Sequence, residues 1–146
     1  MKLVIQRVKS AEVIIDQKTY SKIEQGLLVY VAFKAGDGPK EIEKAVNKLK
    51  NLRIFEDENE KMNLDISKVN GEVLLVSQFT LYADLKRGNR PSFINSLNGI
   101  EAIELYDLFV NYLSAELPTK TGVFGANMQI KSINDGPVTI IYELGE

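Results

Sequence analysis

The chain contains no histidine and no cysteine among its 146 residues. Without cysteine there is neither a disulfide framework nor a thiolate nucleophile. Without histidine, the Ser-His and Cys-His catalytic arrangements and the usual zinc ligand sets are excluded. Any hydrolytic reaction must therefore use another base or none, and we expect neither a metal ion nor another cofactor.

Long apolar stretches and a strong excess of charge are missing as well. The longest apolar runs fall far short of a membrane span, and Met1-Lys2 opens directly into a strand pattern with no signal peptide. These features predict a cytoplasmic protein with no membrane partner. The formal net charge of −2 argues against strong non-specific nucleic-acid binding, because such binding depends on neutralising phosphates.

Hydrophobic patterns predict a β-rich domain that spans residues 1–146. The predicted strands cover residues 2–9, 11–15, 20–23, 27–33, 72–76, 128–133 and 138–142. The first two are so close in sequence that they suggest an antiparallel pair. Helical spacing of apolar residues predicts one helix after Pro39 and a longer one near 99–116. We therefore expect a single α/β domain, mostly antiparallel, with two main helices packed on the sheet.

Two polar stretches stand out against this framework. Ser77-Gln78-Phe79-Thr80 follows a strong predicted strand and turns polar where that strand should end. Asn134-Asp135-Gly136-Pro137-Val138-Thr139 lies between two apolar runs and contains a turn-forming Gly-Pro pair. Small polar residues at the mouth of a strand are common where a scaffold presents chemistry. Each stretch taken alone also fits a purely structural role: the first as the end of a strand, the second as a turn that starts a strand.

A basic loop, Lys86-Arg87-Gly88-Asn89-Arg90, comes directly after the first polar stretch. It fits a solvated surface loop. Its position beside the candidate site also fits a contact with the phosphates of a substrate tail.

Taken together, the two polar stretches resemble those of the D-aminoacyl-tRNA deacylase family, which removes D-amino acids wrongly esterified to tRNA. Further matches follow in order along the chain: Gln6-Arg7-Val8, Ala11, Val13, Arg53-Ile54-Phe55, Lys61-Met62-Asn63, Gly88-Asn89-Arg90-Pro91-Ser92-Phe93, Thr121-Gly122, Phe124-Gly125-Ala126 and Met128. Glu60 departs from the family, which usually has Gly there. Tyr82 stands where smaller residues are common, so it either changes the pocket or merely packs.

The resemblance implies a pocket in which Ser77, Gln78, Phe79 and Thr80 hold the terminal adenosine and the ester of an aminoacyl-tRNA. The 2′-hydroxyl of that adenosine is thought to assist hydrolysis in the family. Such an ester is already reactive, so fixed donors and a positioned water can suffice. The Thr80 hydroxyl is a weak nucleophile without an adjacent base. We therefore favour a positioning role for Thr80 over a covalent one.

The resemblance also implies a homodimer with shared sites. In the family the Gly136-Pro137 bond is cis, and its loop enters the partner's pocket, where carbonyl oxygens leave no room for an L side chain. Glycine has no side chain to exclude, so glycyl-tRNA mischarged on tRNA-Ala would also be cleaved. Only about 5–6% of X-Pro bonds in folded proteins are cis, so the sequence alone favours trans. On the strength of the resemblance we nevertheless predict a cis bond at Gly136-Pro137. The remaining residues assigned to substrate binding are Val138, Thr139, Arg7, Phe124 and Met128.

Two alternative functions, neither of them catalytic, also fit the sequence. A non-catalytic RNA-binding module would use the basic loop, bind RNA in a salt-sensitive way and cleave no ester. A pure interaction domain would respond to substitution of Thr80 or Gly136 only through its stability. Val138, Ile140 and Tyr142 fit either a dimer interface or the core.

Overall fold

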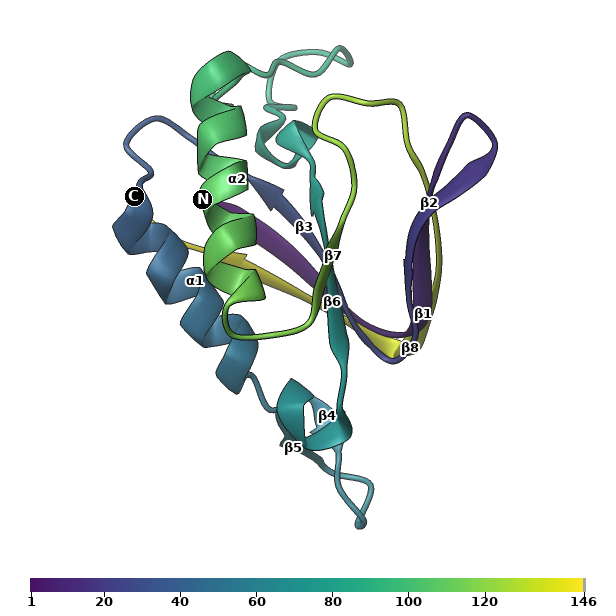
Figure 1. Ribbon diagram of the computed structural model, residues 1–146. Helices are drawn as coiled ribbons and strands as arrows, with labels where there is room; N and C mark the ends of the chain where they lie inside the picture. Colours follow the sequence, from purple (N-terminus) through teal and green to yellow (C-terminus); the bar gives the residue numbers. More distant parts are fainter. Residues whose placement is uncertain (146) are drawn as a thin grey trace.

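Two α-helices cover one face of a curved six-stranded sheet in the computed structural model, which describes residues 1–145 (Figure 1). The helices are α1 (Pro39–Asn51) and α2 (Gly99–Ser114). The strands of the sheet are β1 (Lys2–Ile15), β2 (Lys18–Ile23), β3 (Gly26–Ala32), β6 (Glu72–Ser77), β7 (Thr119–Thr121) and β8 (Gln129–Glu143). The smaller elements are β4 (Phe55–Glu56), β5 (Met62–Leu64) and the 3₁₀ turns η1 (Ile66–Val69) and η2 (Phe79–Tyr82).

The sheet is mixed, so the prediction of a mostly antiparallel sheet is not confirmed. β1 pairs antiparallel with β2, β3 and β8, whereas β3 with β6 and β6 with β7 are parallel. The reason is that α1 lies between β3 and β6, and α2 between β6 and β7, as parallel crossover connections require. The hydroxyl of Ser21 on β2 donates to the carbonyl of Thr121 on β7 at 2.7 Å, so the sheet curls almost into a barrel.

The predicted antiparallel pair at the start of the chain is wrong, because residues 2–15 form one long, bent strand. No glycine or proline interrupts this segment, and β8 pairs with it over most of its length. The two strands predicted near the C-terminus are likewise joined in β8. Gln6 lies opposite Thr139 and Val8 opposite Asn134, so residues 135–138 face only Arg7. These residues therefore form a bulge in β8.

The core lies between the helices and the sheet. Every residue of β3 except Tyr30 is buried, which confirms the predicted central strand. Tyr106 and Phe109 of α2 are buried as predicted, and the Tyr106 hydroxyl donates to the carbonyl of Leu75 at 2.7 Å. The core also contains Val138, while Ile140 and Tyr142 pack against it. Within residues 1–145 no helix is both long and apolar enough to cross a membrane.

Tyr82, the last residue of η2, is buried and does not line the cavity described below. Its ring lies 4.9 Å from the ammonium group of Lys2, and its hydroxyl has no hydrogen-bond partner among residues 1–145. Burial raises the pKa of Tyr82, and the negative charges of Asp37 and Glu143 raise it further. Tyr82 therefore stays neutral at ordinary pH and acts in packing.

We expect Tyr82→Phe to leave the free energy of unfolding unchanged or to raise it by about 1 kcal/mol, because it removes an unpaired buried hydroxyl. Tyr106→Phe is the matched control. It removes a hydrogen bond to a buried carbonyl and should lower stability by about 1–3 kcal/mol. Urea denaturation measures both changes, and equal losses in the two variants would contradict this account of Tyr82.

Candidate active site

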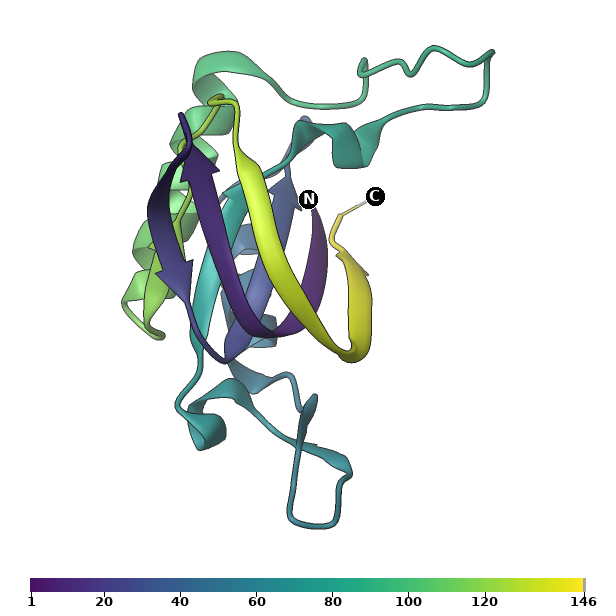
Figure 2. The same cartoon turned by 90° about the vertical axis from the view of Figure 1, so that its right-hand side faces the viewer.

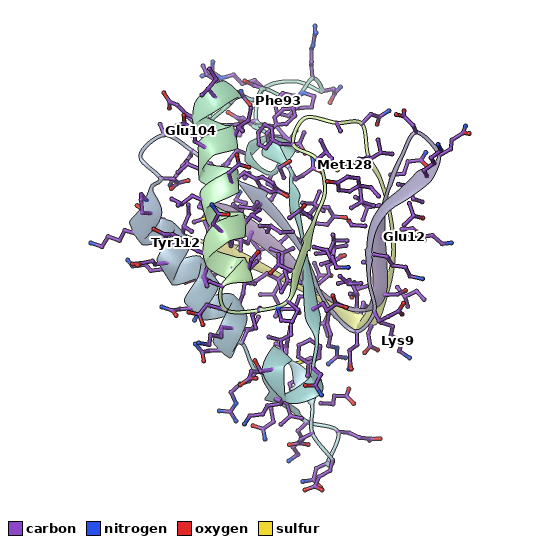
Figure 3. All side chains as sticks on the ribbon, in the orientation of Figure 1. Lys9, Glu12, Phe93, Glu104, Tyr112 and Met128 are labelled. Carbon is purple, nitrogen blue, oxygen red and sulfur yellow. The ribbon has the colours of Figure 1, made fainter. Side chains whose placement is uncertain are left out.

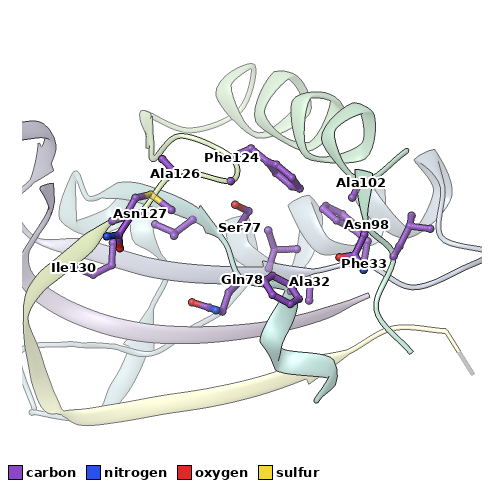
Figure 4. Close-up of a pocket in the computed structure, with 16 residues that line it drawn as sticks. Ala32, Phe33, Ser77, Gln78, Asn98, Ala102, Phe124, Ala126, Asn127 and Ile130 are labelled. Carbon is purple, nitrogen blue, oxygen red and sulfur yellow. The ribbon is translucent and has the colours of Figure 1, made fainter. Parts of the chain in front are cut away.

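A cavity of about 440 Å³ opens where β6 ends and η2 begins (Figure 4). The ends of β3 and β6 form its floor, the loop before β8 forms one wall, and the start of α2 forms the other. Its lining residues from the first polar stretch are Ser77, Gln78 and Phe79. The predicted Phe124 and Met128 come from the loop wall.

Gln78 fixes the geometry at the mouth of this cavity. Its backbone N–H donates to the carbonyl of Val31 at 2.8 Å, and this bond ties the end of β6 to β3. Its side-chain amide donates to the Thr80 hydroxyl oxygen in a short hydrogen bond. Because the Thr80 oxygen accepts this bond, its own proton is free to donate to a ligand. No carboxylate or amine of residues 1–145 bonds to Thr80, so a general base for a Thr80 nucleophile is missing from that part of the chain.

The backbone of η2 supplies further donors. The turn is closed by hydrogen bonds from Leu81 to the Gln78 carbonyl and from Ala83 to the Thr80 carbonyl. The N–H groups of Phe79 and Thr80 open the turn, and so neither has a carbonyl partner within it. Two backbone donors and the Thr80 hydroxyl therefore belong to one short turn that begins at the cavity residue Phe79, and donors grouped in this way can stabilise charge on a carbonyl oxygen.

The remaining walls of the cavity are lined by apolar side chains and by the side-chain amides of two asparagines. Phe124 packs against Tyr106 with ring centroids 5.8 Å apart. Gly122 lies directly beside Met128: a Cβ there would lie 2.5 Å from the Met128 sulfur, so the methionine side chain would have to move. Asn98 and Asn127 also line the cavity, and the sequence analysis missed both. The only signal for Asn98 was its position just before a predicted helix, where asparagine normally caps; here its side chain makes no capping hydrogen bond.

The second polar stretch forms the bulge in β8. The Gly136-Pro137 peptide bond is cis, which confirms that prediction, and both residues are exposed. Buried Arg7 supports the bulge from below. Its Nε donates to the Asp135 carbonyl at 3.1 Å, and its Nη1 donates to the Ile54 carbonyl at 2.7 Å. The Val138 N–H donates to the Asn134 side chain at 3.1 Å, which closes the bulge.

The structure thus separates the predicted residues into two groups. Ser77, Gln78, Phe79, Phe124 and Met128 line the cavity, with Thr80 bonded to Gln78 at its mouth. The other predicted residues lie at the bulge: Arg7, Gly136, Pro137, Val138 and Thr139. Figure 2 shows the yellow bend of β8 and the teal turn η2 toward opposite ends of the sheet. Within one chain the bulge therefore does not reach the cavity.

Comparison with known proteins shows which protein family has this sequence. The family profile described as D-Tyr-tRNA(Tyr) deacylase matches residues 4–143. The chain belongs to this family. It is 52% identical over 145 residues to a D-aminoacyl-tRNA deacylase of Flavobacterium psychrophilum, covering 98% of this chain and 97% of that protein. Membership of the deacylase family makes the chain a hydrolase.

Two solved structures share the fold of this deacylase-family chain. One is described as c-Myc DNA unwinding element binding protein and matches with a TM-score of 0.94 at 38% identity, covering 100% of both chains. The other is described as a probable eukaryotic D-amino acid tRNA deacylase and matches with a TM-score of 0.83 over 98% of both chains. Its identity is 17%, so this second likeness concerns the fold alone.

Proposed function

We propose that the chain hydrolyses the ester bond of D-aminoacyl-tRNA and releases the free D-amino acid and tRNA. The observation that carries the proposal is the set of donors at the mouth of the cavity, in a member of the deacylase family. The N–H groups of Phe79 and Thr80 would hold the ester carbonyl as it gains negative charge. Removing one such donor in other enzymes costs about 3 kcal/mol of transition-state stabilisation.

Thr80 serves as a positioning group in this proposal. Its oxygen already accepts a hydrogen bond from Gln78, and no base adjoins it within residues 1–145. A water molecule attacks the ester carbon, with the 2′-hydroxyl of the terminal adenosine assisting. The chain then needs neither histidine nor cysteine, both of which it lacks. The reaction belongs in the cytoplasm, where tRNA is charged.

Discrimination between D and L substrates is assigned to the bulge of a second copy of the chain. Gly136 and Pro137 are exposed, while Arg7 and Val138 hold the base of the bulge in the protein body. Carbonyl oxygens of the inserted bulge would occupy the space that an L side chain needs, so selectivity comes from exclusion. Glycine has no side chain for the bulge to exclude, so glycyl-tRNA mischarged on tRNA-Ala would be a further substrate.

The outer side of β8 supports a homodimer. Ile133 and Ile141 are 57% and 70% exposed on this strand, which pairs only with β1 among the described strands. An open strand edge with exposed apolar side chains is suited to association with a second copy. Sedimentation at low micromolar concentration tests the assembly, and a fully active monomer would contradict the shared site.

The decisive assay compares release of tyrosine from D-tyrosyl-tRNA and L-tyrosyl-tRNA under identical conditions without added metal. We expect rapid loss of the D ester and no enzyme-dependent loss of the L ester. Equal cleavage of both would retain the hydrolase but remove the proposed role of the bulge. Cleavage of neither would overturn the proposed function.

A second candidate is a nucleic-acid-binding module without catalysis. It is favoured by the basic loop and by the description of a 38% identical structure as a DNA unwinding element binding protein. Salt-sensitive RNA binding without ester cleavage in the paired assay would move this candidate ahead.

A further inference from the structure

Between η2 and α2 the chain leaves the body of the molecule and returns to it, as Figure 2 shows beyond the teal turn. We call residues 85–97 the basic arm. It holds three of the chain's 18 Lys and Arg residues and none of its 20 Asp and Glu residues. The three cations are Lys86, Arg87 and Arg90. A chain with a formal net charge of −2 thus concentrates positive charge in one projecting segment.

Backbone hydrogen bonds close the arm into a loop and attach its C-terminal end beside the cavity. Asp84 and Ser92 exchange two backbone hydrogen bonds, of 2.7 and 3.0 Å, which close its tip into a loop. The Leu97 N–H donates to the Phe33 carbonyl at 2.9 Å, and both of these residues line the cavity. The base of the arm is therefore fixed beside the cavity, and the three cations lie in the loop that the Asp84–Ser92 pair closes.

Aromatic packing supports the root of the arm. Phe93 contacts Phe79, the cavity residue that opens η2, edge to face with centroids 5.1 Å apart. Figure 3 shows Phe93 near the first turn of α2, at the end of the molecule where Met128 also lies. The arm thus contacts the cavity residue Phe79 through Phe93 and ends in the cavity residue Leu97.

The three cations are available for a ligand. All are exposed, and none pairs with a carboxylate in the part of the chain described, residues 1–145. The Asp84 carboxylate at the root instead accepts the backbone N–H of Lys86 at 2.9 Å. Like charges held close together without counter-charges favour a polyanionic partner.

We propose that the basic arm binds the phosphates of the RNA strand whose aminoacylated end enters the cavity. This proposal rests on the proposed function. A cavity of about 440 Å³ suits a group of small-ligand size, so the rest of the strand lies outside it, and the arm is attached at its rim. Arg87 and Arg90 can bind phosphate oxygens with two parallel N–H donors each, while Lys86 adds a point charge.

The test replaces all three cations, as K86Q/R87Q/R90Q. With D-tyrosyl-tRNA, we expect kcat/KM at low salt to fall by about tenfold or more, and the slope of log kcat/KM against log salt to flatten by about two to three. With D-tyrosyl-adenosine, which carries no phosphate, hydrolysis should match that of the unaltered chain. The control K40Q/K44Q/K68Q removes three exposed lysines on α1 and η1 and should leave both substrates unaffected.

Three outcomes would overturn the assignment. One is unchanged hydrolysis of D-tyrosyl-tRNA by the arm variant. Another is an equal loss on D-tyrosyl-adenosine, which would mean that the arm shapes the cavity. The third is an equal loss of affinity for a DNA duplex of similar length, measured by filter binding beside uncharged tRNA, which would mean a general polyanion surface. If the unaltered chain cleaves neither ester, the proposed function is refuted instead. Filter binding of uncharged tRNA to the unaltered chain and to the arm variant would then still test the arm.

Discussion

Thr80→Ala is expected to lower kcat for D-tyrosyl-tRNA by about a hundredfold or more, the loss associated with removing one donor from an oxyanion site. The Thr80 hydroxyl accepts a bond from Gln78 and keeps its proton for the ligand. Alanine removes that donor and also frees the Gln78 amide that sets the cavity mouth. Single-turnover hydrolysis with D-tyrosyl-tRNA measures the effect, and no acyl-enzyme should accumulate in any variant.

Thr80→Ser is the matched control, because it keeps the hydroxyl and loses only a methyl group. It should retain most of the activity, and both variants should unfold at similar urea concentrations since Thr80 is only half-buried. A trapped acyl ester on Thr80 in the unaltered chain would make it the nucleophile. A loss of less than threefold in the alanine variant would remove it from the reaction.

Gly136→Ala is expected to reduce discrimination between D-tyrosyl-tRNA and L-tyrosyl-tRNA by about tenfold or more, because one lost steric or polar restriction is worth 1–3 kcal/mol. Gly136 has a φ of +130°, and a Cβ there would lie 2.8 Å from Val138 Cγ2 and 3.1 Å from Arg7 Nη2. The bulge must shift to relieve these contacts. If the unaltered bulge excludes L-tyrosyl-tRNA as proposed, the variant should then cleave this ester measurably.

Gly36→Ala supplies the control for backbone strain. Gly36 has a φ of +94° but open space around its Cβ position, so the variant bears a similar conformational cost without moving the bulge. Its discrimination should equal that of the unaltered chain. Unchanged discrimination in Gly136→Ala, with an intact fold, would exclude the bulge from substrate selection.

Mixing the two site variants tests whether the bulge acts across subunits. When Gly136→Ala chains are refolded with a large excess of Thr80→Ala chains, most of them join a partner whose bulge is unaltered. Each such dimer keeps one site with both Thr80 and an unaltered Gly136. Cleavage of L-tyrosyl-tRNA should therefore disappear while cleavage of the D ester continues. A bulge that serves its own chain would leave cleavage of the L ester in proportion to the Gly136→Ala chains.

Local patterns predicted the individual elements well. The continuous apolar run at residues 27–33 predicted the buried β3, and helical spacing predicted both α1 and α2. The pairing of the strands was harder to predict from the sequence. Parallel pairing depends on where the helices pack, and the unity of β1 depends on β8, a partner more than a hundred residues away in the chain.

Among the site residues, those that follow a strand directly in the sequence could be predicted, whereas those that folding brings in from distant segments could not. Ser77, Gln78 and Phe79 were predictable because polar residues follow an apolar strand directly. Asn98 and Asn127 were not, because they reach the cavity only after α2 and the loop before β8 fold against the end of β6. The separation of the bulge from the cavity of its own chain was also invisible to any pattern in the sequence.

The pairing of β1 with β8 sets the order of events during synthesis. β1 leaves the ribosome early, yet its partner along one whole edge is residues 129–143. Contacts between such distant segments form slowly, because a long loop must close first. Until then the nascent chain exposes one edge of β1 with its alternating apolar side chains, a surface suited to chaperone binding. The bulge is completed in that same late step, so a chain truncated within β8 would lack the bulge as well as a stable sheet.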